Sequence, residues 1–224
     1  MSSISSPVFG KKYSAFLFDM DGTLLTSIEA AERVWGRWAK SHGLDVETFL
    51  PTMHGKRGVD TIRQLGLPGV DPEVESAIIC QGEIEDVEGV KPIPGAIEFL
   101  KSLPPERWAI VTSSPRELAK VRIAAAGLPE PRFIVIAEDV SRGKPSPECF
   151  LLGAKRVGFD AKHCLVFEDV AAGILAGEGA GADVMVITAT HTHPLETAHP
   201  KIPGYIGIGV DIDENGDLTL VDRR

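Results

Sequence analysis

Five short apolar runs alternate with segments of helical periodicity, and this alternation strongly limits the possible folds. Each run is apolar at consecutive positions, which is typical of strands in a parallel sheet that helices cover on both faces. The segments between the runs have prolines near their starts and glycines near their ends, as helices often do. We therefore predict an α/β fold with a doubly wound parallel sheet. The predicted strands are 15–19, 108–113, 133–137, 163–169 and 183–188.

The connection between the first two predicted strands is far longer than one crossover helix. Its first part reads as several amphipathic helices, so we predict a helical insertion over residues 27–92. If both ends of the insertion join the same end of the sheet, they lie side by side and form a hinge. A bundle above the carboxyl ends of the strands covers the crevice where such folds bind ligands. In the first predicted helix, the residues near one face are Ile28, Ala31, Val34, Trp35 and Trp38.

The composition of the 224 residues excludes several classes of function. They are 43% hydrophobic and 25% charged with a formal net charge of −9, so we expect no nucleic-acid partner and no attraction to an anionic membrane. No apolar run approaches the roughly 18 residues that a membrane span requires, and the N-terminal segment lacks the pattern of a secretory signal. The three scattered cysteines fit reduced thiols. We expect a cytoplasmic monomer that binds an anionic small molecule through locally placed positive charge.

Polar and charged side chains follow several of the predicted strands. In a parallel sheet these strand ends lie on one side, so the side chains should converge. Several acids in one place repel one another unless a cation joins them, and Mg²⁺ takes oxygen ligands while leaving positions for water and phosphate. Taken singly, the acidic pairs are commoner in turns or at helix starts, but their joint placement favours a site. The residues are Asp19, Asp21, Thr112, Ser113, Ser114, Glu168 and Asp169, with Lys144 in the loop "SRGKPSPE".

Four motifs occur in a fixed order along the chain: "DMDGT", "VTSS", "GKPSP" and "FEDVAAG". They resemble the four motifs of the haloacid dehalogenase (HAD) superfamily over residues 13–190, and the helical insertion resembles its C1-type cap. The resemblance implies a Rossmann-like HAD core formed by residues 1–26 and 93–224, and a helical cap domain formed by residues 27–92.

The resemblance also implies catalytic and phosphate-binding roles. Asp19 is the expected nucleophile that takes the phosphoryl group as an aspartyl-phosphate, and Asp21 is the expected general acid/base. Thr112, Ser113 and Lys144 are the expected phosphate-binding residues. Members that cleave carbon–halogen bonds lack an aspartate two residues after the nucleophile, so Asp21 indicates phosphoryl transfer. Such transfer depends mainly on positioning and on electrostatic stabilisation of the phosphoryl oxygens.

For the cofactor, the resemblance implies Mg²⁺. Asp169 is expected to complete the metal site with the Asp19 side chain and the Asp21 backbone carbonyl, while Glu168 acts beside the ion or through water. A carboxylate attacks a phosphate dianion only if their repulsion is cancelled, and the metal together with Lys144 has the charge to do so.

The predicted substrate is a small phosphate ester. The basic loop "HGKRGVDTI" in the insertion holds His54, Lys56 and Arg57, which are either solvated surface residues or substrate contacts. This loop and the core motifs look most like the sugar- and polyol-phosphate phosphatase branch, which includes glycerol-phosphate and 2-deoxyglucose-6-phosphate phosphatases. In that branch the cap loop faces the active site, which favours Arg57 or Lys56 as a substrate contact, with His54 as a third candidate. The alternatives are a β-phosphoglucomutase-like phosphomutase and an inactive regulator with the same fold.

Two C-terminal segments also carry potential ligand groups. Residues 211–222 match the first half of a calcium loop, but the Asn215-Gly216 pair between alternating segments favours a β-hairpin. His191, His193 and His199 offer a zinc site or a polar loop.

Overall fold

The computed structural model of the protein describes residues 9–224. The expectation of no secretory signal falls largely on residues 1–8, which lie outside the described part. None of the helices in residues 9–224 combines the length and apolar character needed to cross a membrane. The strands are β1 (Lys12–Tyr13), β2 (Ala15–Phe18), β3 (Leu25–Thr26), β4 (Lys91–Pro92), β5 (Trp108–Val111), β6 (Ile134–Val135), β7 (Cys164–Glu168), β8 (Asp183–Ile187), β9 (Lys201–Ile202), β10 (Ile208–Ile212) and β11 (Leu218–Asp222). The α-helices are α1 (Ile28–Ser41), α2 (Val46–Phe49), α3 (Gly58–Leu65), α4 (Pro72–Glu85), α5 (Ala96–Lys101), α6 (Arg116–Ala125), α7 (Glu148–Val157) and α8 (Ala171–Gly179).

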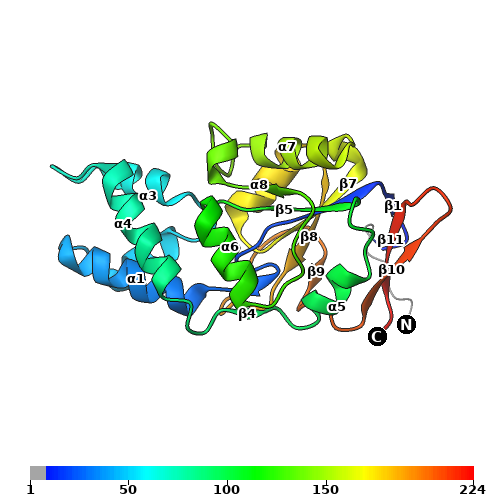
Figure 1. Cartoon of the computed structure of the whole chain (residues 1–224), viewed down its shortest axis with the longest axis horizontal. Helices are drawn as coiled ribbons and strands as arrows, with labels where there is room; N and C mark the ends of the chain where they lie inside the picture. The colour runs from blue at the N-terminus through cyan, green and yellow to red at the C-terminus, as the bar shows by residue number, and fades with distance from the viewer. Residues whose placement is uncertain (1–8) are drawn as a thin grey trace.

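A parallel sheet forms the centre of the molecule (Figure 1). Its six strands have the order β6-β5-β2-β7-β8-β9. The prediction of an α/β fold with a doubly wound parallel sheet is confirmed, and all five predicted strands belong to this sheet. Strand β2 lies between β5 and β7, with Phe18 opposite Ile110 on one side and Phe167 on the other. This central position carries the residues that follow β2 to the middle of the sheet edge.

Alternate residues of the buried strands enter two different cores. Phe16 and Phe18 of β2 pack on one face, where helices α5 and α6 and the C-terminal strands cover the sheet. Leu17 packs on the opposite face under helices α7 and α8. Because successive side chains of a strand point to opposite faces, an uninterrupted apolar run is what such a three-layer arrangement requires.

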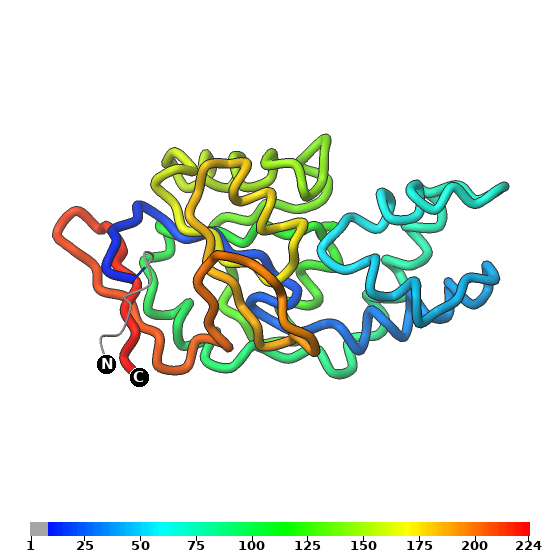
Figure 2. Tube along the Cα trace, turned by 180° about the vertical axis from the view of Figure 1, so that it is seen from behind, coloured from blue at the N-terminus to red at the C-terminus, as the bar shows by residue number. Residues whose placement is uncertain are grey.

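Helices α1 to α4 form a separate cluster at one end of the molecule (Figure 2). Trp35 and Trp38 of α1 are buried there, and both rings lie within 6 Å of the Phe49 ring, at centroid distances of 5.8 and 5.9 Å. The chain enters and leaves this cluster through β3 and β4, which pair antiparallel with Leu25 opposite Pro92. The two connections therefore lie side by side, as predicted; that they act as a hinge stays a prediction.

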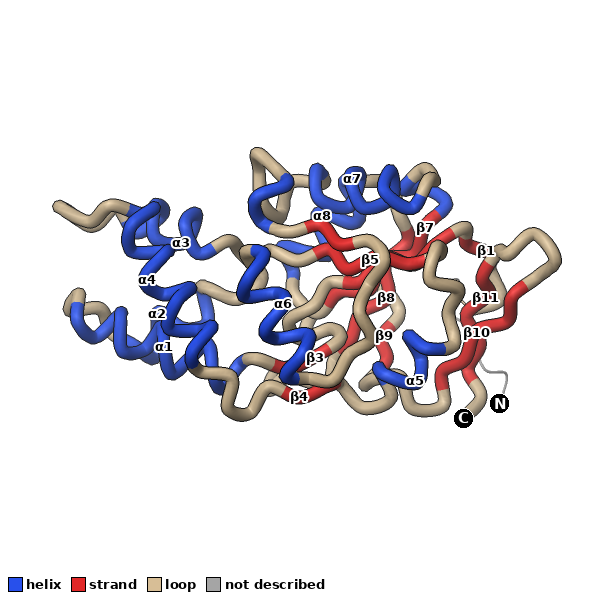
Figure 3. The backbone as a smooth tube through the Cα atoms, viewed as in Figure 1, coloured by secondary structure: helices blue, strands red, loops and turns tan. Residues whose placement is uncertain are grey.

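The C-terminal residues form the predicted β-hairpin. Strands β10 and β11 pair antiparallel, and β1 adds to the other side of β11 (Figure 3). In the turn, Asp213 Oδ1 accepts hydrogen bonds from the backbone N–H groups of Asn215 (2.9 Å) and Asp217 (3.0 Å). Asp213 Oδ2 pairs with Lys12 at 2.6 Å. These contacts make Asp213 a turn-forming residue of the hairpin.

Candidate active site

The candidate site lies where β2, β5 and β7 end. Asp19 directly follows β2, Thr112 follows β5, and Glu168 and Asp169 stand at the end of β7. Because β2 and β7 are neighbours, the Asp19 backbone N–H donates to the Phe167 carbonyl at 2.9 Å, which sets Asp19 beside the acidic pair. Parallel pairing thus brings the carboxylates together.

Lys144 is buried among these carboxylates. Its Nζ donates to Asp19 Oδ1 at 2.5 Å and to Glu168 Oε1 at 2.6 Å, and the Val111 carbonyl lies 3.4 Å away. Burial lowers the pKa of Lys144, but the charges of Asp19 and Glu168 outweigh burial and raise its pKa above the ordinary value. Burial also raises the pKa of Asp19 to about 7, even though Lys144 opposes this shift. The lysine is a fixed positive charge directly beside Asp19.

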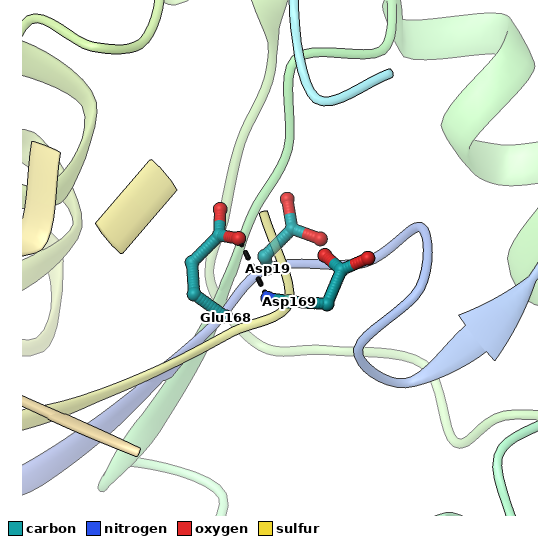
Figure 4. Close-up of side chains that lie close together, drawn as sticks. All are labelled: Asp19, Glu168 and Asp169. Atoms are coloured by element: carbon teal, nitrogen blue, oxygen red, sulfur yellow. Dashed lines mark hydrogen bonds between the residues drawn. The ribbon is translucent and has the colours of Figure 1, made fainter. Parts of the chain in front are cut away.

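Asp19, Glu168 and Asp169 each offer an oxygen within 4.8 Å of the other two, the one such group of three in the described chain. Figure 4 shows the Asp19 and Asp169 carboxylates next to each other, with a Glu168 oxygen accepting from the Asp169 backbone N–H. Glu168 Oε2 also accepts from the Val170 N–H at 3.0 Å, and its Oε1 holds Lys144. Both carboxylate oxygens of Glu168 therefore already accept hydrogen bonds from protein donors.

The Asp169 side chain accepts fewer and weaker hydrogen bonds than that of Glu168. It is only 6% exposed, and Thr23 Oγ1, at 3.4 Å, is its one side-chain donor among the described residues. Burial, followed by repulsion from Glu168 and Asp19, raises the pKa of Asp169 well above its ordinary value. A buried carboxylate without strong donors is costly unless a cation pairs with it. The donor set fits a hard divalent cation held by Asp19 and Asp169, with Glu168 behind them.

Asp21 points into a different hydrogen-bond network. Its Oδ1 accepts from Ser27 Oγ at 2.7 Å and from Arg122 Nη1 at 3.0 Å, and its Oδ2 accepts from Ser114 Oγ at 3.0 Å. Arg122 Nη2 in turn donates to Glu83 Oε1 of helix α4 at 2.9 Å. Arg122 and Glu83 were not predicted from the sequence as site residues. The available signal was a charged residue on the apolar face of a predicted helix, four positions after Leu118 in one helix and after Ile79 in the other.

The predicted phosphate-binding hydroxyls lie at the end of β5. Thr112 is 3% exposed, and its Oγ1 accepts from the Ser114 backbone N–H at 3.0 Å. Ser113 Oγ donates to the Gly55 carbonyl of the insertion at 3.2 Å. Both residues line, together with Asp19 and Asp21, a cavity of about 90 Å³ between the sheet edge and the insertion.

The three basic residues of the insertion loop lie in two different environments. His54 and Lys56 line the cavity between the sheet edge and the insertion. Arg57 does not: its Nη1 and Nη2 donate to the backbone carbonyls of Val140 (3.0 Å) and Ser141 (3.2 Å), and its Nε pairs with Asp60 at 2.6 Å. Arg57 therefore attaches the insertion to the loop that leads to Lys144.

Two of the three C-terminal histidines, His191 and His193, line one groove, and His199 lies outside it. The ring Nε2 of His191 contacts the Asp169 carbonyl at 2.7 Å, and that of His199 contacts Glu178 at 2.7 Å. His193 lines a larger open groove of about 740 Å³ beside Asp169 and His54. They do not form one of the potential metal clusters of the described chain.

Comparison with known proteins assigns the family. The model of the haloacid dehalogenase-like hydrolases matches residues 13–181. The chain is 42% identical over 210 residues to hexitol phosphatase A of Escherichia coli, covering 92% of this chain and 97% of that protein. It is 34% identical over 192 residues to glycerol-1-phosphate phosphohydrolase 1 of Saccharomyces cerevisiae, covering 80% of this chain and 76% of that protein. A solved hydrolase structure from Pseudomonas syringae matches with a TM-score of 0.68 at 27% identity, covering 79% and 84% of the two chains.

A parallel sheet with carboxylates at its strand ends, a buried loop lysine between them and a cavity that a helical insertion also lines together define an α/β protein with a charged site between core and insertion. The chain belongs to the haloacid dehalogenase-like hydrolases. The family resemblance of the four motifs is thereby confirmed.

Proposed function

We propose that the protein is a Mg²⁺-dependent phosphatase that hydrolyses a small sugar or polyol phosphate through an aspartyl-phosphate on Asp19. The observation that carries this proposal is the placement of Asp19, which lines a cavity shared by the core and the insertion, against buried Lys144 and beside Asp169. Two of the relatives are named for hexitol and for glycerol-1-phosphate, which supports a polyol phosphate as the substrate class.

In the first step a carboxylate oxygen of Asp19 attacks phosphorus, and the ester P–O bond breaks. Asp21 donates its proton to the departing alkoxide oxygen, which leaves as the alcohol. Lys144 balances charge on the transferred group, while the Thr112 hydroxyl and the Ser113 backbone N–H are the donors at the end of β5. The site would hold Mg²⁺ through the side chains of Asp19 and Asp169 and the Asp21 carbonyl.

When bound, Mg²⁺ withdraws charge from the phosphoryl oxygens. In the second step Asp21, now ionised, takes a proton from water, and the resulting hydroxide attacks phosphorus. The acyl-phosphate P–O bond breaks, so Asp19 returns as a carboxylate and inorganic phosphate is released. Asp21 regains its proton in this step, so both residues complete the cycle unchanged.

We also propose that residues 27–92 act as a cap domain on a core formed by residues 1–26 and 93–224. The cavity of about 90 Å³ beneath this insertion favours small substrates. His54 and Lys56 line it and are the preferred substrate contacts from the cap. Arg57 is engaged with the Val140 and Ser141 carbonyls, so we propose that it contributes to cap closure more than to substrate binding.

A panel of polyol, deoxysugar and hexose phosphates tests the proposal. Purified protein with Mg²⁺ is expected to release inorganic phosphate from at least one of them, with glycerol phosphate and hexitol phosphates as leading candidates. The same reactions are assayed for isomerised sugar, because a phosphomutase would convert β-glucose 1-phosphate to glucose 6-phosphate faster than it releases phosphate. Isomerisation without net hydrolysis would replace the phosphatase assignment, and inertness toward the whole panel would support a regulator.

A glycine substitution tests the placement of Asp169. Gly22 has φ +97°, and a Cβ at this position would lie 1.9 Å from Asp169 Oδ2. We expect Gly22→Ala to displace the Asp169 carboxylate and to lower kcat by about 10²-fold, the typical cost of a misplacement near 1 Å. Gly158→Ala is the matched control, since Gly158 has φ +87° but open space around its Cβ position.

Both variants carry the backbone strain of an alanine at positive φ, about 1–2 kcal/mol. Thermal unfolding measures this shared cost, and phosphate release measures the displacement that is specific to Gly22. Equal turnover in the two variants would show that the position of Asp169 does not matter for the reaction.

A further inference from the structure

Arg122 is a buried cation that the proposed mechanism does not use. It lies on helix α6 of the core and is 5% exposed. Its Nη1 donates to Asp21 Oδ1 at 3.0 Å and to Ser114 Oγ at 3.3 Å. Ser114 Oγ itself donates to Asp21 Oδ2 at 3.0 Å. One guanidinium thus restrains both oxygens of Asp21, one directly and the other through a serine.

The other terminal nitrogen of this guanidinium, Nη2, binds a residue of the insertion. Arg122 Nη2 donates to Oε1 of Glu83 at 2.9 Å, and Glu83 belongs to helix α4 and is 8% exposed. Burial raises the pKa of the Glu83 carboxyl, against the opposing effect of Arg122. The pair crosses the boundary between helix α6 and helix α4, and both residues line the cavity that holds Asp19 and Asp21.

Stability alone does not explain this pair. A buried ion pair contributes little net stability, because the desolvation of both charges offsets their attraction, and apolar residues of similar volume often serve as well or better. A planar guanidinium with donors in a fixed fork does, however, set the orientation of the carboxylates that it binds. Asp21 needs such a restraint, because a general acid must lie within about 2.6–3.2 Å of the oxygen that it protonates.

We propose that Arg122 is a positioning residue for Asp21, and that Glu83 makes this positioning depend on the docking of helix α4 against the core. The proposal rests on the proposed function, since Asp21 matters as the acid/base of that reaction. When Nη1 and Nη2 are both hydrogen-bonded, the guanidinium of Arg122 has one orientation relative to Asp21. When α4 moves away, Nη2 loses its partner and the orientation of the guanidinium is no longer fixed. Proton transfer is thereby tied to a closed site.

The central test is the double variant Arg122→Met/Glu83→Leu, which replaces the buried pair by apolar residues of similar size. Its thermal unfolding is expected to stay close to that of the wild type, because such replacements are usually tolerated. Two esters are then compared in rapid-quench experiments with Mg²⁺: glycerol phosphate, whose alkoxide must be protonated, and p-nitrophenyl phosphate, whose leaving anion needs no proton.

The double variant is expected to release glycerol in the first turnover about 10²-fold more slowly, the lower range of a general-acid contribution. The burst of nitrophenolate should change by about threefold or less, since the nucleophile and its charges are intact. Arg33→Met is the matched control, because Arg33 forms a bidentate pair with Asp86 in the insertion but does not line the cavity. It should leave both rates unchanged.

Single variants separate the two roles. Arg122→Lys keeps the charge but not the fork, so it should recover only part of the glycerol rate. Glu83→Gln keeps an oxygen acceptor for Nη2, so its rate of glycerol release should fall less than that of Glu83→Leu. A folded double variant with wild-type rates, or one in which both esters slow equally, would overturn the proposal.

If the wild type cleaves neither of these esters nor any other ester of the panel, the proposed function fails, and a structural measurement still decides whether Arg122 positions Asp21. A crystal structure of the double variant should show the Asp21 carboxylate turned away from Ser114. An unmoved Asp21 carboxylate would contradict the positioning role independently of any activity.

Discussion

Replacement of Asp19 by asparagine is expected to abolish phosphate release from any ester that the wild type hydrolyses. The amide has nearly the same shape, but it cannot attack phosphorus to form an acyl-phosphate, so turnover should fall by at least about 10³-fold. Acid-quenched wild-type enzyme should carry a phosphoryl group on Asp19 in peptide mass spectrometry, and Asp19→Asn should carry none. The substitution also removes the negative charge that Lys144 pairs with at 2.5 Å.

The matched control is Asp160→Asn, which makes the same chemical change at an exposed carboxylate near the start of β7. It should retain wild-type turnover. Circular dichroism and thermal unfolding establish that both variants are folded before rates are compared. Persistent turnover by pure, folded Asp19→Asn protein would exclude Asp19 as the nucleophile and would require another group to receive the phosphoryl group.

Removal of divalent metal is expected to have a comparably large effect. Without a metal ion, Lys144 alone balances Asp19, Glu168 and Asp169, and a phosphate dianion would add further negative charge. Chelation should therefore lower phosphate release by about 10³-fold or more, and added Mg²⁺ should restore it. Ca²⁺ is the informative comparison, because its larger size and higher coordination number alter the arrangement of the same oxygens. Full activity in a chelator would contradict the assignment of these carboxylates to a metal.

The same site predicts how the metal-dependent stabilisation varies with pH. Burial raises the pKa of Asp19 from 3.8 to about 7, and that of Asp169 is raised as well. The native metal-free state therefore binds more protons than the unfolded state, so its stability falls as the pH rises from about 4 to about 7. Mg²⁺ competes with these protons. The increase in Tm on adding Mg²⁺ should thus be larger at about pH 8 than at about pH 5.5. A pH-independent increase would contradict this.

Much of the fold follows from local patterns in the chain. A strand such as β2 is apolar at every position, and only a sheet covered on both faces accommodates that pattern. Parallel strands then bring their carboxyl ends to one edge, so the convergence of Asp19, Lys144 and Asp169 was predictable from the sequence. The hairpin was predictable for the same kind of reason, because the Asn215-Gly216 pair has a strong conformational preference of its own.

Other features of the fold and the site could not be predicted from sequence patterns. Strand β1 has only two residues and pairs with β11 at the far end of the chain. The loop "HGKR" offered two adjacent basic residues as substrate contacts, and packing directs Lys56 to the cavity and Arg57 to the backbone of the core. No local preference distinguishes these two neighbours, because their partners come from distant segments.

The chemistry of the site was thus predictable from short motifs, since each motif combines a strand end with residue types that suit phosphoryl transfer. The restraint on its acid/base was decided by tertiary packing alone. Asp21 and Arg122 are 101 positions apart, and Arg122 and Glu83 are 39 apart. Hydropathy and helical spacing describe which face of α6 and α4 is buried, but they do not say which charges meet there. Only the docking of the two helices brings those charges within hydrogen-bond distance.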